Sequence, residues 1–150
     1  MPLRVTVQTG SMGAGVRPPG RVLKSAVRDA ARDTLAECGV EDAELSVTLL
    51  GDRAIARLNR EWLGHDGTTD VLSFPLFADG EAPVGDVYIG VPQARRQAEA
   101  LGVTLREELC RLAIHGTLHV LGYDHPESNA RERSKMWRTQ ERILAKVMGA

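Results

Sequence analysis

The amino-acid sequence predicts an α/β (α+β) fold, in which a mixed, mostly parallel sheet of four strands packs with about five helices. Segments with the period-two alternation of strands occur in turn with segments whose apolar residues recur at helical spacing. A short connection joins the last two predicted strands, which favours an antiparallel pair, whereas helices connect the earlier strands. The 150 residues, 43% of them hydrophobic, suit one globular domain, 1–150.

The first half of the chain is predicted to alternate strands and helices. Its elements are strand 3–9, a glycine- and proline-rich loop 10–20, helix 19–38, strand 44–50 and a short helix from residue 52. Leu3, Val5 and Val7 alternate with polar residues, which is typical of a half-buried strand. Gly39 is expected to end the first helix, and the Asp52 side chain to cap the second, which carries Ile55, Leu58 and Trp62.

The second half is predicted to contain two strands and three helices. They are strand 71–75, strand 84–91, a helix from 92 to 102, a helix opened at 104 and a final helix from 126, with polar turns at 64–70 and 78–83. Thr104 and Glu107 form a capping box. Pro126 suits a first helical turn. The apolar stripe of the final helix, which includes Met136, Trp137 and Leu144, is expected to pack on the body of the domain.

Residues 115–125 hold three of the four histidines of the chain. On a helix His115 and His119 lie one turn apart and face the same side, so their imidazoles can converge on one ion. Gly122 can take the left-handed conformation that ends a helix, and a chain that turns back there can bring His125 to the same point. Three imidazoles with an open fourth position for water form a site typical of catalytic zinc.

Gly116 separates this pattern from the zinc proteases. Histidines four apart, followed by a glycine and a third histidine, match the spacing of extended zinc-protease motifs. In those motifs the residue after the first histidine is a glutamate that acts as the general base, and here it is Gly116. The ligands are present without the base, so the pattern predicts a metal site and disfavours peptide hydrolysis by the standard mechanism.

Charge and composition indicate whether the chain is a membrane protein, a secreted protein or a nucleic-acid-binding protein. No run of residues approaches the roughly 20 apolar residues of a membrane span, and the N-terminus lacks the apolar core of a signal peptide, so we expect a cytoplasmic protein without membrane contact. The net charge of -1 gives no evidence for nucleic acid. Residues 126–150, however, hold six basic and three acidic residues. This run either places a positive face for a polyanion beside the metal or is only a solvated helix face.

Two segments together resemble the signature segments of the YbeY family of bacterial metal-dependent endoribonucleases. They are TDVLSFP at residues 69–75 and HGTLHVLGYDH at residues 115–125, and the segments 58–59 and 85–89 also fit that family's pattern. The resemblance implies that His115, His119 and His125 are the ligands of one zinc ion. It also implies a mixed α/β fold and single-stranded RNA, not DNA, as substrate. The role that it implies is maturation of the 3′ end of 16S ribosomal RNA and ribosome quality control, with the small ribosomal subunit and its assembly factors as partners.

The sequence departs from the family at one position. Many members carry an arginine after the aromatic residue that follows the Leu-Asn segment, and here that position is Leu63. Arg60 and His65 are the candidates to replace its positive charge, although His65 also fits a turn residue without a chemical role. The general base is not identified by the pattern. Asp124, beside a ligand, either accepts a proton or orients a histidine, and Asp70 and Asp86 are further candidates for such an orienting role. For each of these carboxylates a structural role, capping or hydrogen-bonding the loops, fits better than proton transfer.

Three functions therefore compete. The first is a zinc-dependent, single-strand-specific endoribonuclease, in which the metal lowers the pKa of water to roughly 7. The second is a metallopeptidase or another metal-dependent hydrolase, which the histidine spacing supports and Gly116 disfavours. The third is a ribosome-assembly binding factor with a structural metal, which the absent arginine at Leu63 supports.

Overall fold

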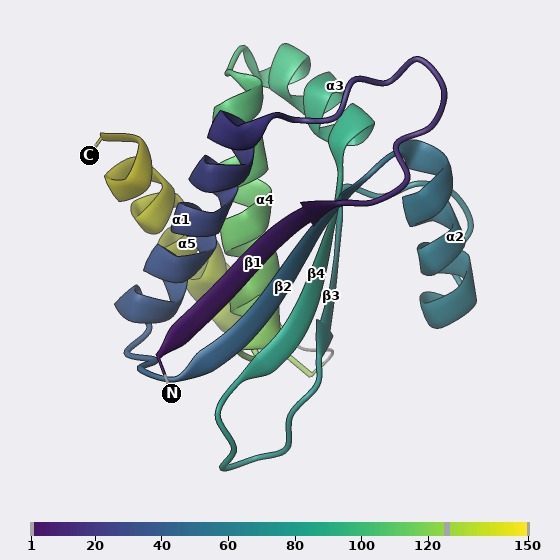
Figure 1. Ribbon diagram of the computed structural model, residues 1–150. Coiled ribbons are helices and arrows are strands. Elements are labelled where there is room, and N and C mark those ends of the chain that lie inside the picture. The colour runs from purple at the N-terminus through teal and green to yellow at the C-terminus, as the bar shows by residue number, and fades with distance from the viewer. Residues whose placement is uncertain (1, 125–126, 150) are drawn as a thin grey trace.

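The computed structural model describes residues 2–124 and 127–149, and Figure 1 shows a central sheet with helices on both of its faces. The elements are β1 (Leu3–Thr9), α1 (Arg21–Glu37), β2 (Ala43–Leu50), α2 (Asp52–Leu63), β3 (Val71–Pro75), β4 (Val84–Gly90), α3 (Val91–Leu101), α4 (Leu105–Val120) and α5 (Ala130–Gly149). The strand order is β1-β2-β4-β3. β1, β2 and β4 run parallel, and β3 pairs antiparallel with β4. The prediction of a mixed, mostly parallel sheet is therefore confirmed.

The helices cover the two faces of the sheet unequally. α1 and α4 pack on one face, and α5 lies outside them against α4 and α1 (Figure 1). The core on this side includes Val47 and Val87 of the sheet and Leu109 and Ile114 of α4, all of them fully buried. α2 lies over the other face, where a smaller apolar cluster forms around Ile55. Consecutive residues of a strand face opposite sides of the sheet. Adjacent residues along β3, and along β4, therefore contact different helices.

α4 is the most deeply buried helix and carries two of the histidines. Its first turn is capped by Thr104, whose Oγ1 accepts a hydrogen bond from the backbone N–H of Glu107 at 3.1 Å. At its other end the backbone N–H groups of Gly122 and Tyr123 donate to the carbonyls of His119 and Leu118, both at 3.0 Å. Gly122 has a φ of 97°, so this pair of bonds is the glycine-dependent Schellman ending that the sequence predicts.

Two predicted helix starts are wrong. Asp52 does not cap α2: Gly51 precedes the helix without a side-chain cap, and the Asp52 carboxylate instead accepts hydrogen bonds from Arg96 at 2.8 and 3.1 Å. The final helix begins at Ala130, not at residue 126, which lies outside the described residues. Its first turn is capped by Asn129, whose Oδ1 accepts from the backbone N–H of Glu132 at 2.9 Å, and this side-chain cap fixes the start.

The predicted apolar stripe of α5 is also corrected in one position. Met136, Ile143 and Leu144 are buried against α4 and α1, whereas Trp137 is 62% exposed. Trp137 follows Met136 by one residue, which rotates its side chain by about 100° away from the buried row.

Among the described residues, none of the helices combines the length and the apolar character that a membrane span needs.

Candidate metal centre

The structure brings together two of the three histidines of the predicted site. His115 and His119 lie one turn apart on α4, and their Nε2 atoms are 3.0 Å apart, with ring centroids at 4.6 Å. Both side chains are half-buried. The two imidazoles therefore present ring nitrogens to one point beside the helix.

The other ring nitrogen of His115 is held by a residue of α5. His115 Nδ1 lies 2.6 Å from Oε1 of Gln140. An amide oxygen only accepts hydrogen bonds, so Nδ1 carries the proton and donates it. A neutral His115 then has its lone pair on Nε2, the nitrogen that faces His119. This is the tautomer that a metal ion at that point requires.

Burial keeps His119 in the form that binds metals. Loss of solvent around its ring lowers the pKa of His119, and the neighbouring His115 lowers it further, while the carboxylate of Asp124 acts in the opposite direction. The neutral imidazole, which has a lone pair for a metal, is favoured as a result.

The fit of a metal ion can be judged from the two nitrogens. Nitrogens bonded at about 2.0–2.1 Å to a tetrahedral zinc ion are roughly 3.3 Å apart. The observed separation of 3.0 Å between the Nε2 atoms is close to that value. Two neutral nitrogen donors of this kind suit Zn²⁺, and a third donor would complete the set.

His125 lies outside the described residues, so its place relative to the pair is left as a prediction. The backbone turns sharply just before it, since Gly122 and Asp124 both have left-handed conformations with φ of 97° and 52°. Within 2–124 and 127–149 no three side chains of histidine, cysteine, aspartate or glutamate form a group that could hold a metal.

Gly116 occupies a position that faces the sheet. A Cβ added there would lie 2.6 Å from Cγ1 of Val87 and 3.2 Å from Oγ of Ser73. Ser73 also donates a hydrogen bond to the Gly116 carbonyl at 3.0 Å, which ties α4 to β3. A side chain at this position would therefore point towards β3 and β4 and collide with their buried side chains. The glutamate of the zinc proteases has no room here.

The two candidates to replace the positive charge of the family arginine, whose position is Leu63 in this chain, lie on the other side of the sheet from His115 and His119. Arg60 is exposed on α2, and Leu63 and His65 are exposed at its end. α2 covers the face formed by Leu72, Phe74 and Tyr88, whereas α4 covers the face formed by Val71 and Ser73. These exposed groups are available to contact a long substrate rather than the atoms between the two imidazoles.

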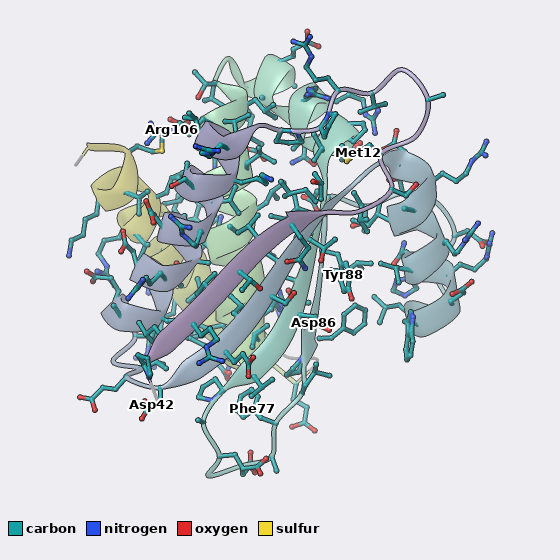
Figure 2. The ribbon with its side chains drawn as sticks, viewed as in Figure 1. Met12, Asp42, Phe77, Asp86, Tyr88 and Arg106 are labelled. Carbon is teal, nitrogen blue, oxygen red and sulfur yellow. The ribbon has the colours of Figure 1, made fainter. Side chains whose placement is uncertain are left out.

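Asp86 also faces away from the histidines. A Cβ on its neighbour Gly85 would lie 2.6 Å from Val120 of α4, so the next side chain points to the opposite face. Figure 2 shows Asp86 and Tyr88 together on that face. The proposed role of Asp86 in orienting a histidine is therefore wrong. Asp70 lies at the start of β3, where its backbone carbonyl accepts from Gly90 at 2.8 Å, and its side chain remains a candidate.

Asp124 is the candidate carboxylate that the structure leaves closest to the pair. It is half-buried, and its charge raises the pKa of His119. A hollow of about 240 Å³ lies beside it, between the end of α4 and the side chains of Glu132 and Lys135 on α5. This position suits an orienting group or a proton acceptor, and it also allows the structural role that the sequence leaves open.

Gln140 is the residue in contact with the histidine pair that sequence reasoning missed. It is 7% exposed and lies in the buried row of α5 with Met136, Ile143 and Leu144. A polar side chain at a core position was the available signal, because buried polar groups need a specific partner. That partner, His115, is 25 residues away along the chain, and only the packing of α5 on α4 brings the two together.

The sequence of this chain is similar to those of bacterial endoribonucleases. A protein of Thermus thermophilus named endoribonuclease YbeY is 47% identical over 133 residues, which cover 86% of this chain and 94% of the relative. A protein of Persephonella marina with the same name is 41% identical over 132 residues, 84% of each chain. The protein is thus a hydrolase that acts on phosphodiester bonds of RNA.

The family follows from a direct match. The family model described as endoribonuclease YbeY matches residues 19–148, and the chain belongs to this family. The solution structure of TM1509 from Thermotoga maritima is similar in fold, with a TM-score of 0.69 and 26% identity, covering 97% of this chain and 89% of that one. The resemblance seen in the sequence is thereby confirmed.

Proposed function

We propose that this chain is a single-domain, zinc-dependent endoribonuclease, 1–150, that cleaves single-stranded RNA. In this proposal His115, His119 and His125 hold one Zn²⁺, and water occupies the remaining position. The observation that carries the proposal is the convergence of the His115 and His119 Nε2 atoms at 3.0 Å. Membership of an endoribonuclease family supports RNA as the substrate.

In this proposal the two histidines of α4 and Asp124 have different roles in phosphodiester hydrolysis. Bound Zn²⁺ supplies a dipositive charge that makes water a stronger acid and stabilises negative charge on phosphate oxygens. His115, held through Nδ1 by Gln140, and His119, kept neutral by burial, supply lone pairs from a rigid helix. Asp124 lies in reach of this region and is the candidate to accept a proton or to orient a ligand.

The binding of a long RNA strand would fall to groups outside this centre. Exposed arginine and lysine side chains follow the centre along the first turns of α5, among them Arg131, Arg133 and Lys135. Such charges attract the phosphate backbone without reading its sequence. On the far face of the sheet Arg60 and His65 are exposed and are the candidates for the cation that Leu63 does not provide.

We propose further that the substrate is precursor 16S ribosomal RNA, cut near its 3′ end, and that the protein acts in the cytoplasm with the small ribosomal subunit and its assembly factors. The family resemblance supports this role. The metallopeptidase alternative is disfavoured, because Gly116 faces Val87 and leaves no room for the catalytic glutamate. A binding factor with a structural metal is the alternative that Leu63 supports, and it predicts metal without cleavage.

A cleavage assay with matched histidine variants tests the proposal. Metal-loaded wild-type protein should cut a single-stranded RNA and leave the duplex form of the same RNA and single-stranded DNA intact. H119A should lose both the metal and the cleavage, whereas H65A, which changes an exposed histidine on the opposite face, should keep the metal. Cleavage that survives in H119A, or hydrolysis of peptides with RNA untouched, would contradict the proposal.

A further inference from the structure

Gln140 of α5 and His115 of α4 form a hydrogen bond between a side-chain amide and an imidazole. Oε1 of Gln140 lies 2.6 Å from Nδ1 of His115, and Gln140 is 7% exposed. At this separation and burial the bond fixes both the rotation of the ring and the nitrogen that carries the proton. Rotation of the His115 ring away from the point shared with His119 would break it.

The orientation of the Gln140 amide is itself determined by its other neighbour. Nε2 of Gln140 donates to Oε2 of Glu141 at 3.0 Å. A carboxylate only accepts hydrogen bonds, so the amide nitrogen has to face Glu141 and the amide oxygen has to face His115. The flipped amide would place two acceptors together at Glu141.

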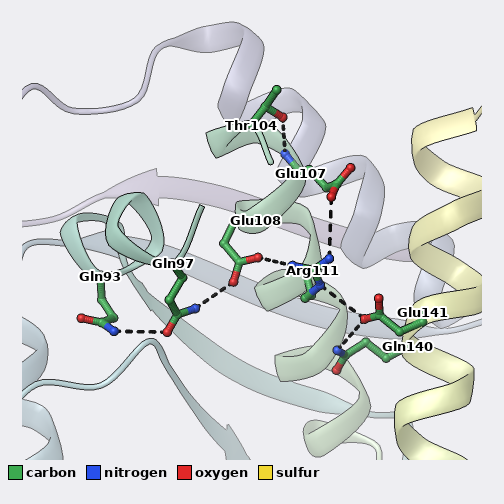
Figure 3. Close-up of polar contacts among 8 residues, drawn as sticks. All are labelled: Gln93, Gln97, Thr104, Glu107, Glu108, Arg111, Gln140 and Glu141. Atoms are coloured by element: carbon green, nitrogen blue, oxygen red, sulfur yellow. Dashed lines mark hydrogen bonds and ion pairs between the residues drawn. The ribbon is translucent and has the colours of Figure 1, made fainter. Parts of the chain in front are cut away.

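Glu141 is held in turn by Arg111 of α4. The Arg111 guanidinium lies 3.3 Å from Oε2 of Glu141 and also pairs with Glu107 and Glu108. Glu108 is 2% exposed, and its other oxygen accepts from Nε2 of Gln97 on α3 at 2.7 Å. Figure 3 shows this polar chain from α3 through α4 to α5. Glu108 and Gln140 are buried and the other members are partly buried, and each has a partner within the network, which holds Gln140 in one position.

The place of Gln140 in α5 argues against a role in packing. Its neighbours in the buried row, Met136, Ile143 and Leu144, are apolar. An apolar side chain would fill the same position without the cost of burying an amide. The amide oxygen has His115 as its partner, and an imidazole that binds a metal through one nitrogen usually donates the other N–H to an acceptor of this kind.

We propose that Gln140 is a positioning residue of the metal centre: it holds His115 in the tautomer and ring orientation that present Nε2 to the metal, and it thereby sets the affinity of the site. Glu141 and Arg111 fix the direction of its amide. This inference rests on the proposed metal site. It adds a residue of a different helix, which contacts no metal and no substrate.

The test compares two nearly isosteric variants of the full chain, Q140M and Q93M. Gln93 bonds to Gln97 at 3.2 Å at the far end of the same polar chain, so Q93M controls for the loss of a glutamine without touching His115. Zinc affinity is measured by competition with a chromophoric chelator. We expect Q140M to bind zinc about 10- to 100-fold more weakly than wild type, the usual effect of removing a partner of a ligand, and Q93M to keep wild-type affinity.

A conservative variant and a spectroscopic readout separate positioning from packing. Q140E is made in the E141Q background, so that the new carboxylate meets the amide donor of residue 141 and not a second carboxylate. The carboxylate at position 140 accepts the same hydrogen bond from His115, so this variant should match or exceed wild-type affinity. Imidazole nitrogen shifts of the metal-free protein, measured by ¹⁵N NMR, should show His115 protonated on Nδ1 in wild type and Q93M, and mixed between the two nitrogens in Q140M. If Q140M does not fold, Q140E alone decides, because the inference requires it to retain affinity.

Three results would overturn the inference: wild-type affinity in folded Q140M, affinity in Q140E as weak as in Q140M, or an unchanged His115 tautomer in Q140M. Failure of the proposed function is distinguishable, because it would show in the wild-type arm as the absence of zinc binding. The NMR arm needs no metal and reports the hold of Gln140 on His115 in either case.

Discussion

Replacement of Gly116 by alanine tests the close approach of α4 to the sheet. The added Cβ would lie 2.6 Å from Cγ1 of Val87 and 3.2 Å from Cγ2 of Val71, whereas carbon atoms in contact prefer about 3.5–4.0 Å. Val87 is fully buried in β4, so neither group can move without disturbing the core. Overpacking of this kind costs about 1–3 kcal/mol, partly offset by roughly 1 kcal/mol from the higher helix propensity of alanine. We expect G116A to lose about 0–2 kcal/mol of unfolding free energy.

The matched control is Gly149, a second glycine within a helix. A Cβ at Gly149 would meet nothing within 4 Å, so G149A adds a methyl group without the clash, and because Gly149 is the last residue of α5 its gain in helix propensity is smaller than at Gly116. The free energy of unfolding is measured by urea denaturation in the presence of a chelator, which removes any contribution from bound metal. We expect G116A to be less stable than G149A by up to about 2 kcal/mol.

A double-mutant cycle with V87A identifies the clash itself. Shortening Val87 removes the Cγ1 atom, so G116A should cost less in the V87A background, with a coupling of about 1 kcal/mol or more. The absence of coupling between G116A and V87A would refute the steric account. The residue after His115 would then be free to change, and its glycine would need another explanation.

Three further predictions concern a cap and two ionisable groups. T104A should lose about 0.5–2 kcal/mol in urea denaturation, because Oγ1 of Thr104 accepts the backbone N–H at the start of α4; an unchanged midpoint would contradict this. Burial raises the pKa of the Cys110 thiol from 9.0 to about 11, so stability should fall as pH rises from about 9 towards 11, and C110A should lack this part of the fall. Hydrogen bonds from Lys146 and Arg142 lower the pKa of Glu37, so its contribution is present above the ordinary carboxyl pKa and lost as pH falls through the lower folded value. E37Q should flatten that acid limb of the stability curve, and an identical curve would refute the pairing.

Most of the sheet could be predicted because each strand has one buried face. The alternation of Leu3, Val5 and Val7 predicts strand 3–9, which the structure has at Leu3–Thr9, and strand 71–75 is also reproduced at Val71–Pro75. The short connection between β3 and β4 correctly predicts an antiparallel pair. The strand order β1-β2-β4-β3 has no such local signal, because it depends on how helices far apart in the sequence pack together.

Helix starts were harder to predict than helix interiors. Asp52 has the residue type of a cap, but its carboxylate is drawn to Arg96, a residue 44 positions further along the chain. Asn129 does act as a cap, whereas the sequence interpretation placed the start of the helix at Pro126. In both cases the deciding contact involves geometry that a residue type alone does not specify.

In the candidate metal centre, too, features set by local spacing could be predicted and features set by distant residues could not. The spacing of His115 and His119 is a helical repeat, so their convergence follows from the sequence alone. Gly116 could be recognised as a departure from protease motifs, but its cause, the contact with Val87, is visible only in the structure. Gln140 reaches His115 from another helix, and no sequence spacing relates the two.

The coordination of bound zinc tests the central claim most directly. X-ray absorption at the zinc edge of the metal-loaded protein measures the number and type of atoms around the ion. We expect three imidazole nitrogens at about 2.0–2.1 Å and one exchangeable oxygen in the wild type, and loss of the bound zinc in H119A and in H125A. A closed shell of four protein ligands, or a spectrum unaffected by H119A, would contradict a hydrolytic centre built on His115 and His119.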